Sequence, residues 1–272
     1  MITKNERALL CLLSQTKSLK RMQFVKLMFL ASKERSLYDF VPYQYGPFSF
    51  QLYQDMRHLE REGYLTQNED EVHFVERIYP KPDPWIQGGI ISVVNHFGGF
   101  REKDLVDYVY SKYPEMTIFS KLKQLKTYYR NESGITTIGY EGKSIDRFLL
   151  TLVENKIGKL IDVRKNPFSM KYGYTKSQLE KELKSLGISY IHLPELGIDS
   201  DQRQNLSERG FVELFQRYAM ELGAKEDLLD TIKSLAQKEK VALMCFEAKE
   251  SDCHRGVIAK RFRDEGLDVV AL

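Results

Sequence analysis

The spacing of hydrophobic residues changes near the middle of the chain. Up to about residue 80, apolar residues recur every three or four positions, as they do on one face of an amphipathic helix. From residue 135 onward, short apolar runs rich in Val and Ile alternate with helical segments. This change of period predicts a mainly α N-terminal part and an α/β C-terminal part.

Residues 1–80 are predicted to form a mainly α, winged-helix-like module. Three helical segments, "NERALLCLLSQT", "LKRMQFVKLMFLASKE" and "SFQLYQDMRHLEREG", precede two short strands around a polar turn in "YLTQNEDEVHFVE". Three helices followed by a hairpin are typical of winged helices, which bind DNA or protein partners. Ser49 is expected to cap the third helix.

Residues 81–133 are expected to form a helical extension or connector. The stretch "YPKPDPW" contains three prolines and therefore cannot continue a helix or a central strand. Two later segments, "FREKDLVDYVYSKYP" and "MTIFSKLKQLKTYYR", are amphipathic and predict further helices. The polar stretch "NESG" then marks a second boundary.

Residues 134–272 are predicted to form a Rossmann-like α/β domain. Helical segments separate the apolar runs "ITTIGY", "GKLIDVR", "ISYIHL", "KVALMCF" and "LDVVAL". Strands that alternate with helices pair in parallel, with helices on both faces of the sheet. We therefore expect a mainly parallel five-stranded sheet. No Gly-x-Gly-x-x-Gly follows the first strand, so a dinucleotide site is not expected.

Composition favours a soluble globular protein, with 42% hydrophobic and 29% charged residues. No apolar run approaches the ~18 residues that a membrane span needs, and the N-terminus lacks the apolar core of a signal peptide. Three cysteines are too few for a disulfide framework. We expect a cytoplasmic protein that has no membrane partner.

The net charge of +3 does not by itself predict a nucleic-acid binder, but positive charge is concentrated near the N-terminus. Residues 1–38 carry eight Lys and Arg against two Glu, and "KLKQLKTYYR" forms a second basic cluster. Such asymmetry indicates an anionic partner such as DNA or another nucleic acid, although solvated helix faces also explain it. The predicted nucleic-acid contacts are Lys20, Arg21 and Lys26.

The stretch "YDFVPYQYGPFSF" holds six aromatic residues. Aromatic residues at this density either fill the core of a small domain or form an exposed platform for a partner chain or for bases. The core of the stretch, Tyr43 to Phe48, resembles the Tyr-x-Tyr-Gly-Pro-Phe signature of the SocA-like, or Panacea, domain associated with antitoxins. This resemblance covers about residues 5–80. It implies a non-catalytic module that binds a protein, at Tyr43 to Phe48, or DNA.

Polar side chains follow four of the predicted C-terminal strands. Ligands of an open parallel sheet bind beyond the carboxyl ends of its strands, so a site is expected there. The predicted catalytic residues are Asp162, Glu195, Glu247, Cys253 and His254. The predicted phosphate- or ligand-binding residues are Tyr140, Glu141, Arg164, Lys171 and Arg255. Alternation along the strand places Asp162 and Arg164 on one side, as an anion site or as a structural ion pair.

The stretch "MCFEAKESDCHRG" concentrates the candidate chemistry. Cys253 precedes a predicted helix, whose N-terminus lowers the pKa of a thiol and favours an anion, so Cys253 is the better candidate nucleophile. Cys245 continues a buried strand and is expected to serve in packing. A zinc site at Cys245, Cys253 and His254 is an alternative, but Cys-x7-Cys-His is not a standard zinc spacing. No metal is therefore predicted, and the cofactor is left open.

Two carboxylates of unequal pKa would also suit chemistry at a glycosidic bond. The candidates for such a pair are Glu141, Asp162, Glu195 and Glu247.

Residues 135–272 resemble the bacterial domain of unknown function 488 family. The matching stretches are "TIGYEGKSIDRFLLTLVENKIGKLIDVRKNPFS", "YIHLPELG" and "MCFEAKESDCHRGVIAKRF". Family members usually carry His-Ser where this chain has Tyr140-Glu141. The resemblance implies an α/β domain and supplies no reaction. It implies a site at Asp162, Arg164, Glu195, Cys245, Glu247, Cys253, His254 and Arg255.

The leading hypothesis is a hydrolase or transferase that acts on a nucleotide or a nucleic-acid base, in defence against mobile elements. In it, Arg164 and Arg255 hold phosphate, Asp162 or Glu247 transfers protons, and Cys253 is a nucleophile or a ligand. One alternative is a non-catalytic DNA-binding regulator that senses a small anion. Another is an antitoxin-like adaptor that binds a protein.

Overall fold

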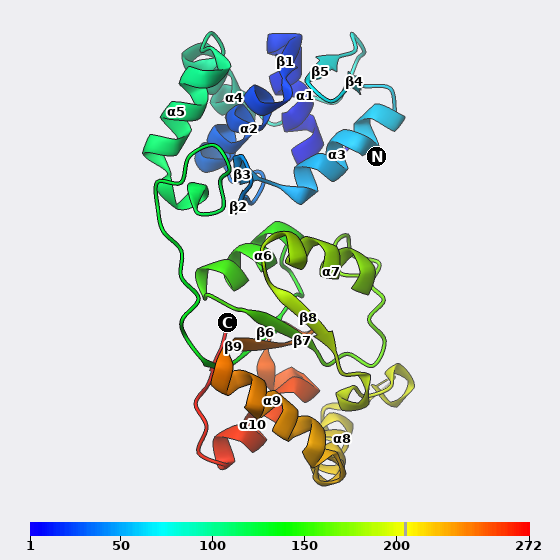
Figure 1. The fold of residues 1–272 in the computed structure, drawn as a ribbon. Coiled ribbons are helices and arrows are strands. Elements are labelled where there is room, and N and C mark those ends of the chain that lie inside the picture. Colours follow the sequence, from blue (N-terminus) through cyan, green and yellow to red (C-terminus); the bar gives the residue numbers. More distant parts are fainter. Residues whose placement is uncertain (204–205) are drawn as a thin grey trace. The chain divides into compact units, whose positions relative to one another are not determined.

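The computed structural model describes residues 1–203 and 206–272, which fold as two units, Met1–Tyr128 and Tyr129–Leu272. Figure 1 shows the elements of each unit. In the described part of the chain, no helix is both long and apolar enough to cross a membrane.

The helices of the N-terminal unit pack around an apolar core that contains the leucines of the first helix. Thr3 and Glu6 form a capping box at the start of that helix. Ser49 accepts a hydrogen bond from the Leu52 amide, which confirms its predicted role as a cap. The helices are α1 (Lys4–Thr16), α2 (Arg21–Arg35), α3 (Phe50–Arg61), α4 (Pro84–Phe97), α5 (Glu102–Lys112) and the 3-10 helix η1 (Pro114–Thr117).

The strands of this unit are short. β1 (Ser18–Lys20), β5 (Glu71–Phe74) and β4 (Leu65–Gln67) form an antiparallel sheet in that order. β2 (Val41–Tyr43) and β3 (Gly46–Phe48) form a separate hairpin within the aromatic stretch.

The helix predicted from "MTIFSKLKQLKTYYR" is wrong, because residues 118–133 contain no helix. The Thr117 hydroxyl accepts a hydrogen bond from the Leu125 amide, and the Ser120 hydroxyl accepts one from the Leu122 amide. Such local side-chain bonds replace the backbone bonds of a helix. Leu122 and Leu125 are 53% and 41% exposed, so the apolar face has little to pack against.

The predicted parallel sheet of the C-terminal unit is confirmed. Its strands pair in parallel in the order β10-β6-β9-β7-β8. Apolar residues fill the central strands because helices cover both faces. The strands are β6 (Gly134–Gly139), β7 (Lys159–Asp162), β8 (Ser189–His192), β9 (Lys240–Cys245) and β10 (Val269–Ala271).

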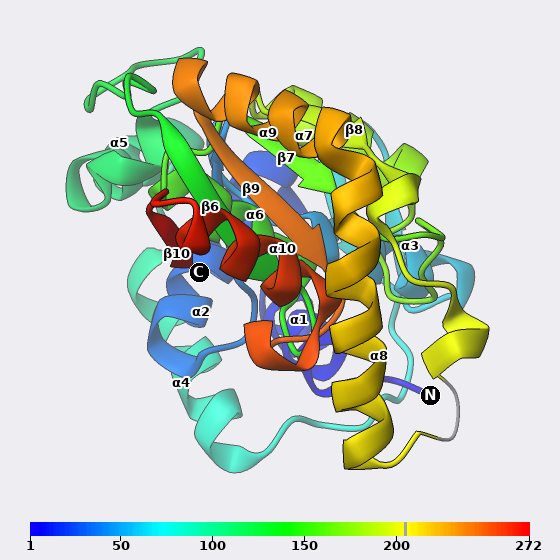
Figure 2. The ribbon, with the colours of Figure 1, turned by 90° about the horizontal axis from the view of Figure 1, so that it is seen from below.

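The helices of this unit divide between the two faces of the sheet (Figure 1). α6 (Ile145–Glu154) and α7 (Lys176–Ser185) cover one face. α8 (Glu208–Glu221), α9 (Glu226–Lys238) and α10 (His254–Asp264) cover the other, as Figure 2 shows from below. Val241, Leu243 and Cys245 of β9 join the core on the α8–α10 side.

The order of the strands places β9 at a special point of the sheet. β9 lies between β6 and β7, whose chains continue into α6 and α7 on one face, whereas the chain after β9 continues into α10 on the other. Neighbouring strands whose connections leave on opposite faces open a crevice at their carboxyl ends. The end of β9 is therefore flanked by such crevices on both sides.

Candidate functional site

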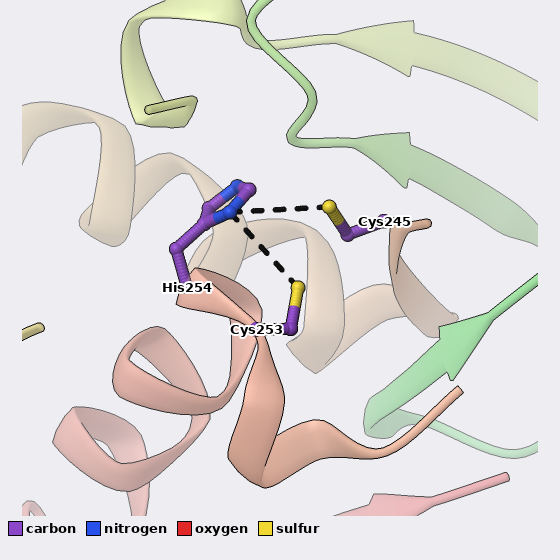
Figure 3. Close-up of side chains that lie close together, drawn as sticks. All are labelled: Cys245, Cys253 and His254. Atoms are coloured by element: carbon purple, nitrogen blue, oxygen red, sulfur yellow. Dashed lines mark hydrogen bonds between the residues drawn. The ribbon is translucent and has the colours of Figure 1, made fainter. Parts of the chain in front are cut away.

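Two thiols and an imidazole meet at the carboxyl end of β9 (Figure 3). Cys245 is the last residue of β9, Cys253 is the N-cap of α10, and His254 is the first residue of that helix. Nδ1 of His254 lies 3.9 Å from the Sγ atom of each cysteine. All three side chains are buried. We refer to Cys245, Cys253 and His254 as the thiol–imidazole cluster.

The orientation of His254 is set by the backbone at the carboxyl end of β7. Its Nε2 atom lies 2.9 Å from the carbonyl oxygen of Val163. A carbonyl only accepts hydrogen bonds, so Nε2 carries the proton and donates it. In the neutral ring, Nδ1 is then unprotonated, and its lone pair is directed to the side where both thiols lie.

The two thiols differ in acidity. Burial acts to raise the pKa of Cys253, but the Cys245 thiol and His254 outweigh it and lower this pKa to about 6. The pKa of Cys245 lies well above its usual value, first because its thiol is hydrogen-bonded to Cys253 and then because it is buried. Cys253 is therefore the more acidic thiol of the pair; the direction is the one predicted, but its cause is the contact with Cys245 and His254 and not the helix N-terminus.

Glu247 lies beside the cluster. Its Oε1 atom accepts a hydrogen bond of 3.0 Å from Arg203. Its Oε2 atom is buried and has no hydrogen-bond partner among the described residues. Burial acts to raise the pKa of Glu247, but the thiols of Cys253 and Cys245 and the charge of Arg203 lower it overall. Glu247 is therefore a carboxylate with one oxygen left for a further partner.

Cys245, Cys253 and His254 are the residues of the described chain that could hold a metal ion, because their ligand atoms all lie within 4.8 Å of one another. The neighbours Cys253 and His254 point to one place because Cys253 has an extended backbone whereas His254 is helical. The unusual sequence spacing, which argued against a metal, thus does not prevent the three side chains from converging.

Asp162 and Arg164 form a buried ion pair at the end of β7. Nε and Nη2 of Arg164 donate to the Asp162 carboxylate over 2.6 to 3.1 Å, and Nη1 donates to the Tyr140 hydroxyl over 3.0 Å. The Tyr190 hydroxyl donates to Asp162 over 2.6 Å. Burial and the Asp162 charge raise the pKa of Tyr190, which keeps this donor protonated. These contacts favour a structural role for Arg164 over the predicted phosphate contact.

Arg255 is also engaged within the protein and is only 1% exposed. Its Nη1 and Nη2 atoms donate to the carbonyl oxygens of Glu247 and Ala248, over 2.6 and 3.0 Å. Its Nε atom has no partner among the described residues. Arg255 therefore holds the β9–α10 loop (residues 246–253), and these contacts do not favour its predicted role with phosphate.

The loop after β6 holds the β9–α10 loop from the other side. The Glu141 carboxylate accepts a hydrogen bond of 2.9 Å from the Ala248 amide, and the backbone amides of Tyr140 and Glu141 bond to the Phe246 carbonyl. A Cβ atom on Gly139 would lie 1.9 Å from the Glu247 carbonyl oxygen. Only glycine allows this approach of the two backbones.

The remaining predicted residues lie further from the thiols. Lys171 donates to the Tyr140 carbonyl over 3.1 Å, and burial lowers its pKa. Glu195 is exposed in the 3-10 helix η2 (Pro194–Leu196), and no described hydrogen bond or ion pair links it to the thiol–imidazole cluster.

Two residues of the site were missed by sequence reasoning. Tyr190 stands on β8, and the period of that strand could have placed it beside β7. Arg203 lies 44 positions before Glu247 and gives no local signal.

A groove of about 700 Å³ between α8 and α10 leads to Cys253. We call it the α8–α10 groove. Val212, Phe215 and Val257 give it an apolar wall, and Gln216 and Ser251 are polar groups beside that wall. The groove lies on the face of the sheet where Cys245 joins the core.

The three predicted nucleic-acid contacts of the N-terminal unit have different environments. Lys20 is exposed. Arg21 donates to Gln67 and to the carbonyls of Asn68 and Glu69, and so holds the β4–β5 turn. Lys26 is only 1% exposed. A buried ammonium group is poorly placed to contact a phosphate backbone, so this burial does not favour the predicted nucleic-acid contact of Lys26.

The aromatic stretch is partly core and partly surface. Tyr43, Phe48 and Phe50 pack against one another, with ring centroids 4.7 to 5.8 Å apart. Tyr45 is 50% exposed. The stretch lines a cleft of about 590 Å³ that is also lined by Lys26.

Residues 144–262 match the family described as "Domain of unknown function DUF488". The match includes the β9–α10 loop and supports the resemblance stated for the C-terminal half. It does not reach the N-terminal unit. No curated protein and no solved structure matches the chain.

Proposed function

We propose that the chain is an enzyme, a hydrolase or transferase, that acts on a nucleotide or a nucleic-acid base. The observation that carries the proposal is the convergence of the thiol–imidazole cluster with the Glu247 carboxylate at the end of β9. Polar groups without full hydrogen bonding are costly to bury, so a core that served only for packing would not retain them. Reacting groups at a crevice beyond a strand end suit a catalytic site.

The α8–α10 groove supports a base as the substrate. A base has flat apolar faces and polar edges, and enzymes read it by aromatic stacking and by hydrogen bonds. Phe215 offers an aromatic surface, and Gln216 and Ser251 offer hydrogen-bonding groups in the same groove. Because Cys253 lines the groove as well, a bound base would lie next to one of the reacting groups.

The second part of the proposal is that the N-terminal unit is a winged-helix-like module that brings the enzyme to DNA. It is supported by the order α1, α2, α3 with the small antiparallel sheet β1-β5-β4. Lys20 on β1 and Arg57 and Arg61 on α3 are exposed on this unit. We place the protein in the cytoplasm, in defence against mobile elements.

The enzymatic proposal is tested by incubating the full chain with nucleotides and with single- and double-stranded DNA, followed by mass spectrometry of the products. We expect Glu247→Gln and Cys253→Ala to slow product formation at least about 100-fold, which is typical of losing a proton-transfer group. Cys11→Ala, a buried thiol of the other unit, should leave the rate unchanged. Equal rates in wild type and Glu247→Gln, or no product from any substrate, would contradict the proposal.

DNA binding is tested separately, by affinity as a function of salt. Replacing Lys20 and Arg61 by Ala should weaken binding and reduce the salt slope by about one for each phosphate that is no longer neutralised. DNA binding without turnover would favour the non-catalytic regulator that senses an anion.

A protein partner is the second candidate for the N-terminal unit. It is favoured by the half-exposed Tyr45 beside a cleft in the aromatic stretch. Capture of a defined cellular protein that is lost in Tyr45→Ala, with no DNA binding at low salt, would replace the DNA proposal by an antitoxin-like adaptor.

A further inference from the structure

We propose that Cys245, Cys253 and His254 bind one Zn²⁺ ion and leave a fourth coordination position open beside Glu247. The inference deepens the proposed function, because it concerns the same cluster and supplies its cofactor. Its test measures the metal itself and does not depend on finding a substrate.

The distances within the cluster suit a tetrahedral zinc ion. Zinc binds thiolate sulfur at about 2.3 Å and imidazole nitrogen at about 2.0 Å, so tetrahedral sulfur and nitrogen ligands lie about 3.6 Å apart. Nδ1 of His254 lies 3.9 Å from the sulfur of Cys245 and 3.9 Å from that of Cys253. The two sulfur atoms lie within 4.8 Å of each other, and a tetrahedral zinc would place them about 3.8 Å apart. A movement of about one ångström or less therefore brings the three atoms to ligand positions.

The imidazole is already oriented as a metal requires. In the neutral ring, the hydrogen bond to the Val163 carbonyl keeps the proton on Nε2 and leaves the Nδ1 lone pair for a metal. Zinc-bound histidines generally donate their other N–H to a carbonyl or a carboxylate, which fixes the ring and its tautomer. The cluster therefore contains both the ligands and an outer partner of the kind found around zinc.

Charge and hydrogen bonding point to the same ion. Metal binding would convert both cysteines to thiolates, which are costly to bury unless a cation neutralises them, and Zn²⁺ with two thiolates and a neutral imidazole has no net charge. The buried Oε2 atom of Glu247 has no described partner. A water molecule on the open position of the zinc would donate a hydrogen bond to this oxygen. Three protein ligands and a water are the pattern of catalytic zinc sites.

The proposal is tested on the reduced full-length protein, by elemental analysis and by replacing zinc with Co²⁺. We expect one Zn²⁺ per chain, and a thiolate-to-cobalt charge-transfer band with the intense visible bands of tetrahedral Co²⁺. Cys245→Ser, Cys253→Ser and His254→Ala should each weaken Zn²⁺ binding more than about 100-fold, beyond what loss of an outer partner causes. Glu247→Gln should weaken it by less.

Cys11→Ala is the matched control, because Cys11 is a buried free thiol in the other unit. It should keep the full metal content and the cobalt spectrum. If a ligand variant fails to fold, the proposal is still tested by the thiolate-to-cobalt band in the spectrum of the wild type. A cobalt spectrum without a thiolate band would overturn the proposal, as would equal zinc content in wild type and the Cys245→Ser/Cys253→Ser double variant. Absence of turnover with intact zinc binding would count against the proposed function alone.

Discussion

Replacing Lys26 by Met is expected to stabilise the N-terminal unit and to change how its stability depends on pH. Lys26 is only 1% exposed, and its ammonium group donates to the Tyr45 carbonyl. Burial lowers the pKa of Lys26 from 10.5 to about 7. Folding therefore disfavours the charged form of this side chain.

The pKa difference sets the magnitude. A fall of the Lys26 pKa from 10.5 to about 7 corresponds to about 5 kcal/mol of free energy. The folded state loses this full amount of stability at pH values below 7. Between pH 7 and 10.5 the unfolded chain binds more protons than the folded one, so stability rises by about 1.4 kcal/mol per pH unit. Met cannot donate to the Tyr45 carbonyl, which costs about 1 to 2 kcal/mol. We expect a net gain of about 3 kcal/mol for Lys26→Met at pH 7.

The assay uses the single tryptophan of the chain, Trp85 in α4, whose fluorescence reports on the N-terminal unit. Urea unfolding is measured at pH 7 and pH 9. From pH 7 to pH 9, the free energy of unfolding of the wild type should rise by about 2 to 3 kcal/mol more than that of Lys26→Met. Lys33→Met, at an exposed position of the same helix, should keep the wild-type dependence. If wild type and Lys26→Met shift equally with pH, the reasoning is refuted.

Three further predictions concern the C-terminal unit. Asp162→Asn leaves the buried Arg164 without its countercharge. It should lower the free energy of unfolding, measured in denaturant, by about 3 to 5 kcal/mol. A loss below about 1 kcal/mol would show that the pair is not structural. In Gly139→Ala, the added methyl group would clash with the Glu247 carbonyl, which should weaken Zn²⁺ binding. Gly223→Ala, whose methyl group meets no neighbour, should leave Zn²⁺ binding unchanged. Equal zinc affinities of the two variants would contradict the prediction. Chelation of zinc should lower the unfolding temperature of this unit, and an unchanged temperature would indicate that the folded state gains nothing from the ion.

The C-terminal sheet could be predicted because its apolar runs are short, rich in β-branched residues and separated by helical periods. A strand buried on both faces has a continuous apolar sequence, whichever strands lie next to it in the sheet. The order of the strands carries no such local signal. The position of β9 between β6 and β7, which creates the crevices at its end, had to come from the structure.

The environments of two charged residues, Lys26 and Arg164, could not be predicted from their sequence neighbours. Lys26 lies among basic residues of α2, and its sequence neighbours predict a solvated face. The β2–β3 hairpin covers it, and the Tyr45 carbonyl accepts from its ammonium group. In the same way, the pairing of Asp162 with Arg164 followed from strand alternation, but the engagement of Arg164 by Tyr140 depends on a distant segment.

The bond between His254 and the Val163 carbonyl has a consequence for mutational scans of this protein. Every side chain at position 163 presents the same carbonyl, so substitutions there cannot delete the acceptor that orients the imidazole. Val163 is itself buried in the core, so a scan would report the lost packing of its side chain and not the role of its carbonyl. Only a change that displaces the backbone after β7, such as an insertion or a deletion, would reveal that the two positions form one functional unit.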